Sequence, residues 1–215
     1  MPRQLMIHTL TPTRIPMLNN ITRRTFVALA SSSVAIAATP SWALTQGEAR
    51  KLVDSLVAKI NSVIGSSKSE AAMIKEFQGI FRRYADVPIM AQYALGVDGR
   101  RASASQKRAF GKAFEIYIAR KYGKRFREFV GGKVEVKSSR KINAGYEVKT
   151  KASLRGSAPF EVTFLVSSKS GKDLFFNMFI EGVNLLLTER TEIGALLDRN
   201  GGNFDKMIAD LKKAG

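Results

Sequence analysis

Two short runs in this 215-residue chain have side chains that could do chemistry. Residues 168–172 (SKSGK) resemble the end of a phosphate-binding loop, but the motif's first glycine falls at Val166 and Asp173 replaces its Ser or Thr. Residues 138–141 (SSRK) have the spacing of a Ser-Lys catalytic pair, but they lie at the end of an expected strand instead of opening a helix. We therefore interpret the first run as a hairpin turn and the spacing of the second as chance.

Carboxylate pairs are the remaining route to acid–base catalysis. Glu147 and Glu161 fall on the polar sides of their expected strands, where solubility explains them. Glu181 follows Ile180 and precedes Gly182 at the end of an apolar strand, where a buried carboxylate would need a partner. We interpret Glu181 as structural, and the sequence predicts no enzyme active site.

The first 43 residues have the features of an export signal. Residues 22–26 (TRRTF) form a twin-arginine motif, an uncharged run follows at 26–38, and Ser41 and Ala43 suit cleavage after Ala43. The uncharged run is too short to span a bilayer, which takes about 20 residues. We expect a periplasmic protein of residues 44–215, and Met17 is a second candidate for the start of translation.

Removal of residues 1–43 limits the chemistry further. The one His (His8) and the one Trp (Trp42) precede the expected cut, and the chain has no Cys. Residues 44–215 therefore lack imidazole and thiol groups, which excludes His or Cys metal sites, Ser-His or Cys-His nucleophiles and disulfides. We expect neither a metal nor a cofactor, although a purely carboxylate metal site stays open in principle.

The expected mature chain is strongly basic. Four of the 35 lysines and arginines and none of the 18 acidic residues lie before residue 44, so residues 44–215 carry a formal charge of +13. Such a charge favours anionic partners. Export excludes nucleic acid as the natural partner and leaves anionic lipid or lipopolysaccharide, with a generally basic surface of no specific partner as the alternative.

The elements that must hold any site follow from capping and periodicity. Capping residues start expected helices at Thr45, Ser67, Asp86 and Ser103, the last running to about residue 130, with apolar residues at helical spacing. From residue 133 the apolar period becomes two, which predicts four strands around residues 134–136, 146–152, 160–166 and 174–180. Helical patterns return near 193–197 and 204–211. The sequence thus predicts an α+β domain: N-terminal helices, a four-stranded antiparallel meander, and C-terminal helices packed on the sheet.

Two stretches of the chain together carry a family pattern. The first comprises residues 84–96 (YADVPIMAQYALG), 100–103 (RRAS) and 106–110 (QKRAF); the second comprises residues 179–185 (FIEGVNL), 201–202 (GG) and 207–211 (MIADL). In these stretches the chain resembles the MlaC family, the periplasmic phospholipid-binding proteins also called toluene-tolerance proteins. The chain departs from the family pattern at Gly99, where Trp is usual, at Asn184, where Ser is usual, and at residues 189–193 (ERTEI), where the family has Tyr-Arg-Ser-x-Phe.

The resemblance implies a non-enzymatic carrier that shuttles phospholipid between an outer-membrane lipoprotein complex and an inner-membrane ABC lipid transporter. The acyl chains would enter an apolar cavity between the sheet and the helices, with the headgroup near solvent. We expect a monomer that contacts anionic membranes transiently. The expected lining residues, all apolar or aromatic, are Phe110, Phe114, Tyr117, Phe164, Val166, Phe176, Met178 and Ile180.

A basic face of the long helix is the candidate docking surface for membranes or acidic partners. It comprises Arg120, Lys121, Lys124 and Arg125. Three alternatives stay open: a carrier of hopanoid-type polycyclic lipid, a solidly packed module that binds polysaccharide or lipopolysaccharide, and a hydrolase that uses Glu181 with a Lys or Ser.

Overall fold

Most of the helices begin where their capping residues predict. The computed structural model describes residues 44–215, and α1 (Gln46–Ile64) starts at a capping box in which the Glu48 amide donates to Thr45 Oγ1 at 3.2 Å and the Thr45 amide to Glu48 Oε2 at 2.8 Å. A second box, of Ser103 with Gln106, starts α4 (Ala104–Gly123). Each box pairs backbone amides that the first helical turn leaves free.

Two helix ends differ from the sequence prediction. Helix α2 (Glu70–Tyr84) is capped by Ser69 and not by Ser67, because Ser69 directly precedes the first helical residue and its hydroxyl accepts from the Ala72 amide. Helix α4 ends at Gly123 instead of near residue 130 and continues as the short 3-10 helix η2 (Lys124–Arg127). A Cβ on Gly123 would lie 3.1 Å from the Ile74 Cα, so α4 passes close to α2 at its end.

The remaining helices are short. Asp86 caps α3 (Val87–Leu95), with Pro88 in its first turn, and the 3-10 helix η1 (Gly96–Arg100) leads from it to α4. After the sheet come α5 (Leu185–Arg199) and α6 (Phe204–Leu211), each capped by an asparagine.

The strands form one antiparallel meander in the order β1-β2-β3-β4-β5. Their bounds are β1 (Lys133–Ile142), β2 (Gly145–Ser153), β3 (Phe160–Ser167), β4 (Leu174–Ile180) and β5 (Val183–Asn184). The fifth strand, two residues long, was not predicted; the turn at Glu181 and Gly182 joins it to β4. Both turn residues have positive φ, 49° and 79°, as a two-residue type I′ hairpin requires.

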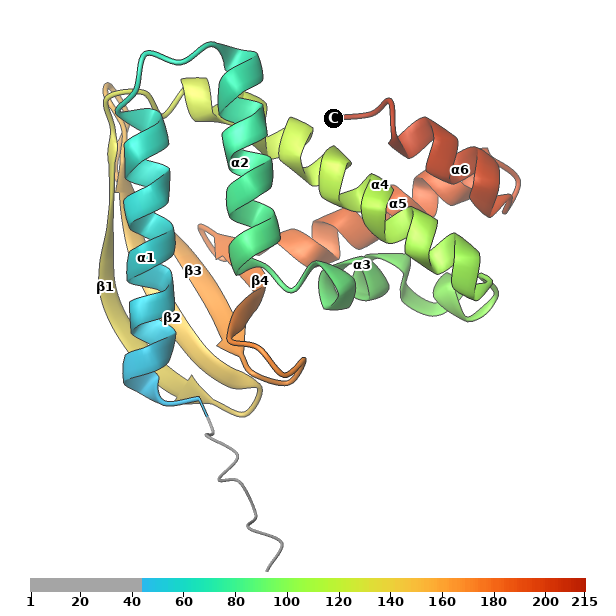
Figure 1. Cartoon of the computed structure of the whole chain (residues 1–215), viewed down its shortest axis with the longest axis horizontal. Coiled ribbons are helices and arrows are strands. Elements are labelled where there is room, and N and C mark those ends of the chain that lie inside the picture. Colours follow the sequence, from blue (N-terminus) through green and yellow to red (C-terminus); the bar gives the residue numbers. More distant parts are fainter. Residues whose placement is uncertain (1–43) are drawn as a thin grey trace, which may run out of the picture. The chain divides into compact units, whose positions relative to one another are not determined.

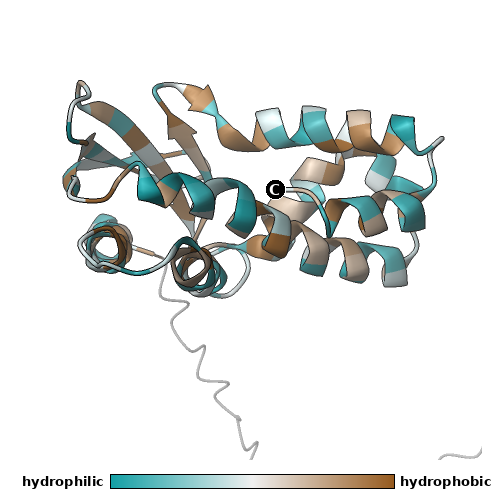
Figure 2. Ribbon diagram, turned by 90° about the horizontal axis from the view of Figure 1, so that it is seen from above, coloured by the Kyte–Doolittle hydropathy of each residue, from teal (hydrophilic) through white to brown (hydrophobic). Residues whose placement is uncertain are grey.

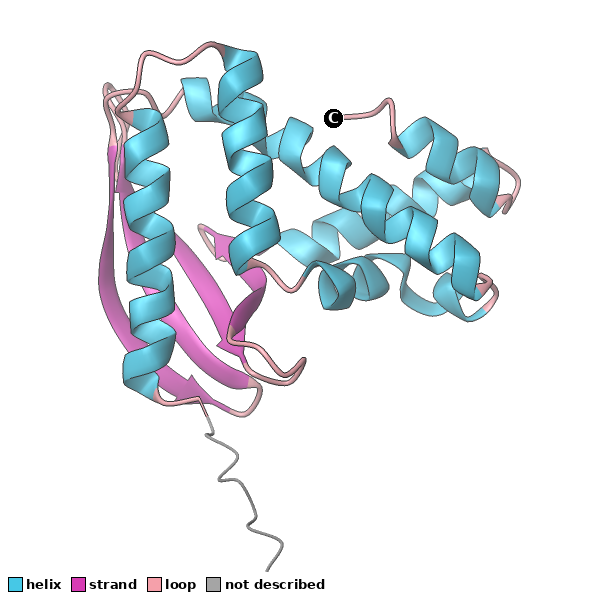
Figure 3. Cartoon of the chain, in the orientation of Figure 1, coloured by secondary structure: helices cyan, strands magenta, loops and turns pink. Residues whose placement is uncertain are grey.

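The sheet lies against α1 and α2, while α3 to α6 gather beside it as a helical cluster (Figures 1 and 3). Helix α1 runs along β1, α2 packs on α4, and α3 packs on α5. Apolar and polar residues alternate along the helices and strands (Figure 2), as one-sided burial requires. The α+β architecture predicted from the sequence is confirmed.

The expected export signal, residues 1–43, lies outside the described residues. Within residues 44–215, no helix combines the length and apolar character needed to cross a bilayer. The same residues contain no cluster of three or more metal-ligating side chains.

Candidate functional site

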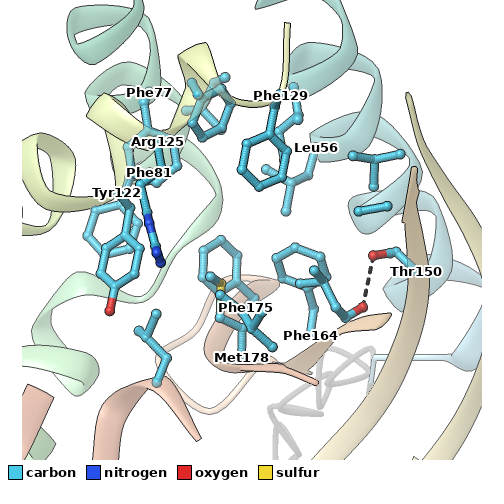
Figure 4. A pocket seen from close by; sticks show the side chains of 18 of the residues that line it. Leu56, Phe77, Phe81, Tyr122, Arg125, Phe129, Thr150, Phe164, Phe175 and Met178 are labelled. Carbon is cyan, nitrogen blue, oxygen red and sulfur yellow. Dashed lines mark hydrogen bonds between the residues drawn. The ribbon is translucent and has the colours of Figure 1, made fainter. Parts of the chain in front are cut away.

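A cavity of about 290 Å³ lies between the inner face of the sheet and helices α1, α2 and η2 (Figure 4). Its walls are almost wholly apolar because the inward positions of each element carry aliphatic or aromatic residues. The aliphatic lining residues are Leu56, Ile60, Ile80, Met90, Ile118, Val134, Ala152, Leu154, Val162, Met178, Ile180 and Leu185.

Seven phenylalanines form a chain of ring contacts around this cavity. Adjacent ring centroids lie between 4.9 and 6.2 Å apart. In order around the cavity the rings are Phe164, Phe175, Phe81, Phe77, Phe126, Phe129 and Phe160. The chain starts and finishes on β3, where Val162, a lining residue, lies between its two ends. Tilted and edge-to-face ring contacts of this kind add about 0.5–1.5 kcal/mol each beyond their buried area.

The polar groups of the cavity are paired inside the protein or lie at its mouth. The Thr150 hydroxyl donates to the Val162 carbonyl at 2.8 Å, so it offers the cavity no free donor. The charged lining residues are Arg125, Glu128 and Glu181, and all three are exposed. The cavity therefore opens to solvent between η2 and the β4–β5 turn.

An ion-pair network around the buried Glu189 supports one wall. Glu189 of α5 is fully buried, and its Oε1 accepts from Lys121 Nζ at 2.9 Å and from the hydroxyl of the lining residue Tyr122 at 2.6 Å. Lys121 also reaches Glu192 Oε2 at 2.7 Å, and Tyr117 donates to the same oxygen at 2.8 Å. The network thus ties α4 to α5 behind the cavity.

The electrostatics of the network are mutually reinforcing. Burial, together with the nearby carboxylates, raises the pKa values of Tyr117 and Tyr122. Burial acts to lower the pKa of Lys121, but its hydrogen bonds to Glu189 and Glu192 outweigh this and raise it. Burial likewise acts against the ionised form of Glu192, yet hydrogen bonds from Lys121 and Tyr117 lower its pKa. Lys121 and Glu192 are therefore both charged at neutral pH.

The family model of MlaC, described as "MlaC protein", matches residues 50–213. The chain belongs to the MlaC family. No curated protein matches the chain in sequence. Among solved structures, a phospholipid-binding protein from Ralstonia solanacearum, determined in complex with a phospholipid, superposes with a TM-score of 0.64 at 17% identity. The match covers 76% of this chain and 98% of that one, so the two share a fold.

Three of the eight lining residues predicted for this MlaC-family chain do line the cavity: Phe164, Met178 and Ile180. Phe176 does not, because of a β-bulge. Phe175 pairs with Val166 while Asn177 pairs with Leu165, so Phe176 is the extra residue and Phe175 takes the inward position.

The other four predicted residues are buried elsewhere. Val166 is completely buried beside Phe175 but does not border the cavity. The α4 residues Phe110 and Phe114 pack on each other, with centroids 5.7 Å apart, and Tyr117 belongs to the ion-pair network. Their shared stripe on α4 faces other helices, because the sheet lies nearer the end of α4, where Ile118 and Tyr122 reach the cavity.

The four basic residues predicted as a docking surface do not form one free face. Arg120 donates to the Lys212 carbonyl, and Lys124 donates to the Gly215 carbonyl at 2.8 Å. Lys121 forms ion pairs with Glu189 and Glu192 of α5. Arg125 lies at the cavity mouth.

Most of the phenylalanine ring and Glu189 were not predicted from the sequence. Phe77, Phe81 and Phe126 lie among apolar residues at helical spacing, where core packing explains an aromatic residue equally well. A signal did exist for Glu189, because it and Glu192 lie in the segment that departs from the family pattern.

Proposed function

We propose that this protein is a periplasmic carrier that holds phospholipid acyl chain in the phenylalanine-ringed cavity and moves lipid between outer- and inner-membrane complexes. The observation that carries the proposal is the apolar cavity itself, whose interior polar groups are already paired. Membership of the family and the phospholipid in the Ralstonia solanacearum structure support it. Export through the signal at residues 1–43, with cleavage after Ala43, belongs to the same proposal.

The volume suits a hydrocarbon tail. Since an apolar cavity of about 150 Å³ holds one benzene, 290 Å³ accommodates roughly twelve carbon atoms. Removing that length of chain from water is favourable by about 10 kcal/mol, at about 0.8 kcal/mol per methylene. A tail that leaves a bilayer is already dry, so the cavity has only to match the membrane, and dispersion with water exclusion does this without polar contacts.

The mouth suits the other end of the lipid. A tail of this length would fill the cavity, so the phosphate would emerge between η2 and the β4–β5 turn, where Arg125 is exposed. A guanidinium group is well suited to a phosphate, although Glu128 and Glu181 nearby favour headgroups that also carry a cation.

Native mass spectrometry of the protein purified from its own periplasm tests the proposal. We expect mass increments equal to phospholipids, identified by lipid extraction of the same sample. A polycyclic lipid in the extract would replace phospholipid as the cargo. The bare mass of the chain in every preparation, with the fold verified by circular dichroism, would overturn carriage and favour a binding module that acts through its surface.

A further inference from the structure

A second hollow, of about 990 Å³, lies between α3, η1, the first half of α4 and the β3–β4 loop. It shares no lining residue with the lipid cavity among residues 44–215. Its position means that a ligand there and a lipid in the cavity would not compete for the same side chains.

Five cations border this hollow without an acidic partner. They are Arg100, Lys107, Arg108, Lys112 and Lys172, and none forms an ion pair with another described residue. All five are exposed. Unpaired charges of one sign around a concave surface repel one another and raise the local concentration of anions.

The two acidic residues of the hollow offset only part of this charge. Glu115 is paired with Arg82 at 2.6 Å, which cancels one further lining cation. Asp86 is buried, and its Oδ1 accepts from the Ile89 amide at the start of α3. The net field of the hollow is therefore strongly positive.

The floor of the hollow is apolar and open. Ala91, Leu95 and Phe110 line it beneath the charged rim. A Cβ built on Gly111 would meet no atom within 4 Å, so the backbone of α4 is open to space here. A basic rim over an apolar floor is complementary to an acidic chain segment that carries apolar side chains.

We propose that this hollow docks an acidic, partly apolar segment of another protein. A bilayer surface is flat on this scale and would touch the rim without filling the hollow, whereas a peptide segment can enter it. The proposal goes beyond lipid binding and rests on the charge and shape of the hollow alone.

Fluorescence anisotropy with a short fluorescein-labelled peptide, in which glutamates flank a pair of leucines, tests the proposal. We expect salt-sensitive binding to the wild-type protein, and loss of binding when glutamine replaces each glutamate in the peptide. The paired reversal Arg108→Glu with Lys112→Glu should weaken binding at least about tenfold. The control pair Lys51→Glu with Lys59→Glu, on the exposed side of α1, gives the same net charge and should change binding less than about twofold.

A second pair of variants tests the shape of the hollow at constant charge. Gly111→Trp places an indole ring in the hollow and should weaken peptide binding about as much, whereas Gly79→Trp, at an equally open helical glycine on α2, should not. No binding by the wild type, equal effects of the two charge-reversal pairs, or an unchanged affinity of Gly111→Trp would each overturn the proposal. The proposal would also fall if the Arg108→Glu with Lys112→Glu variant lost its binding to phosphatidylglycerol vesicles but still bound the peptide.

The carrier function can be scored separately in the same samples. Native mass spectrometry should show wild-type lipid content in the Arg108→Glu with Lys112→Glu variant, because neither residue lines the lipid cavity. A failure of docking and a failure of lipid carriage are therefore distinguishable.

Discussion

Filling the cavity from the sheet side should abolish lipid loading while leaving the fold intact. Ala152 of β2 is completely buried and borders the cavity, so a larger side chain at this position enters the space that lipid would occupy. Ala152→Phe adds one phenyl ring to a wall already made of such rings. The matched control, Ala58→Phe, adds the same ring at an exposed position of α1.

The size of the effect follows from the volume. A phenyl ring takes the space of one benzene, about 150 Å³, which is roughly half of the 290 Å³ available. About six methylenes lose their place, and at about 0.8 kcal/mol each the affinity falls by about 5 kcal/mol. That corresponds to more than a thousandfold, so bound lipid should fall below detection.

Native mass spectrometry and lipid extraction measure the outcome, and urea denaturation of delipidated protein checks the fold. Since the new ring fills empty space, the delipidated variant should fold cooperatively. Its free energy of unfolding should fall by no more than about 1–3 kcal/mol relative to delipidated wild type, the usual cost of overpacking strain. Wild-type lipid content in a folded Ala152→Phe protein, equal to that of Ala58→Phe, would show that the lipid does not occupy this cavity.

Four further outcomes are expected. Lys121→Met leaves the buried Glu189 without its cation, so urea denaturation should show a free energy of unfolding lower by about 3–5 kcal/mol. Adding Glu189→Leu should restore much of this loss. A double variant no more stable than the single one would contradict the role of the pair. Glu181→Gly removes a non-glycine residue at positive φ and should raise the free energy of unfolding of delipidated protein by up to about 1 kcal/mol, whereas a marked destabilisation would refute turn strain. The melting temperature should be level from about pH 5 to 9, since residues 44–215 contain no His or Cys. It should fall in acid, where Glu192 with its lowered pKa becomes protonated, and in alkali, where the raised pKa of Tyr122 means that ionisation costs stability. A transition near pH 6.5 would contradict this. Delipidated protein should melt several degrees below loaded protein in differential scanning calorimetry, because lipid binds only the folded state; equal melting temperatures would argue against a tightly held cargo.

Local signals in the sequence predict most of the secondary structure, but not β5 or two of the helix ends. The capping boxes at Thr45 and Ser103 and the period of two after residue 133 predicted the element order and the meander. These signals work because they depend on neighbours within a few residues. The error at α2 has a local cause, because two candidate caps, Ser67 and Ser69, stand two residues apart. The end of α4 at Gly123 lies where this helix passes close to α2, a contact that the sequence does not show.

The site could be predicted only in part, because its geometry depends on contacts between distant residues. Alternation along β3 and β4 correctly assigned Phe164 and Met178 to the cavity. The bulge that exchanges Phe176 for Phe175 is a property of the pairing with β3 and leaves no mark in the sequence of β4. The apolar stripe of α4 around Phe110 has the composition of a cavity wall, but it packs against other helices. Periodicity gives the buried face of a helix but not what covers it.

The cavity sets a condition that the rest of the fold has to satisfy. At about 24 cal/mol per Å³, an unfilled apolar space of 290 Å³ costs about 7 kcal/mol relative to a packed interior, which is comparable with the whole stability of a typical domain. Collapse would recover that free energy, so the walls must resist it. The phenylalanine rings contact one another around the space, and the Lys121–Glu189 pair joins α4 to α5 behind Tyr122. A buried ion pair contributes little net stability, and one attested use of such a pair is to specify a single arrangement. Restraint of α4 against α5 would hold Tyr122 in the cavity wall, which is a physical reason for a charged pair beside an otherwise apolar site.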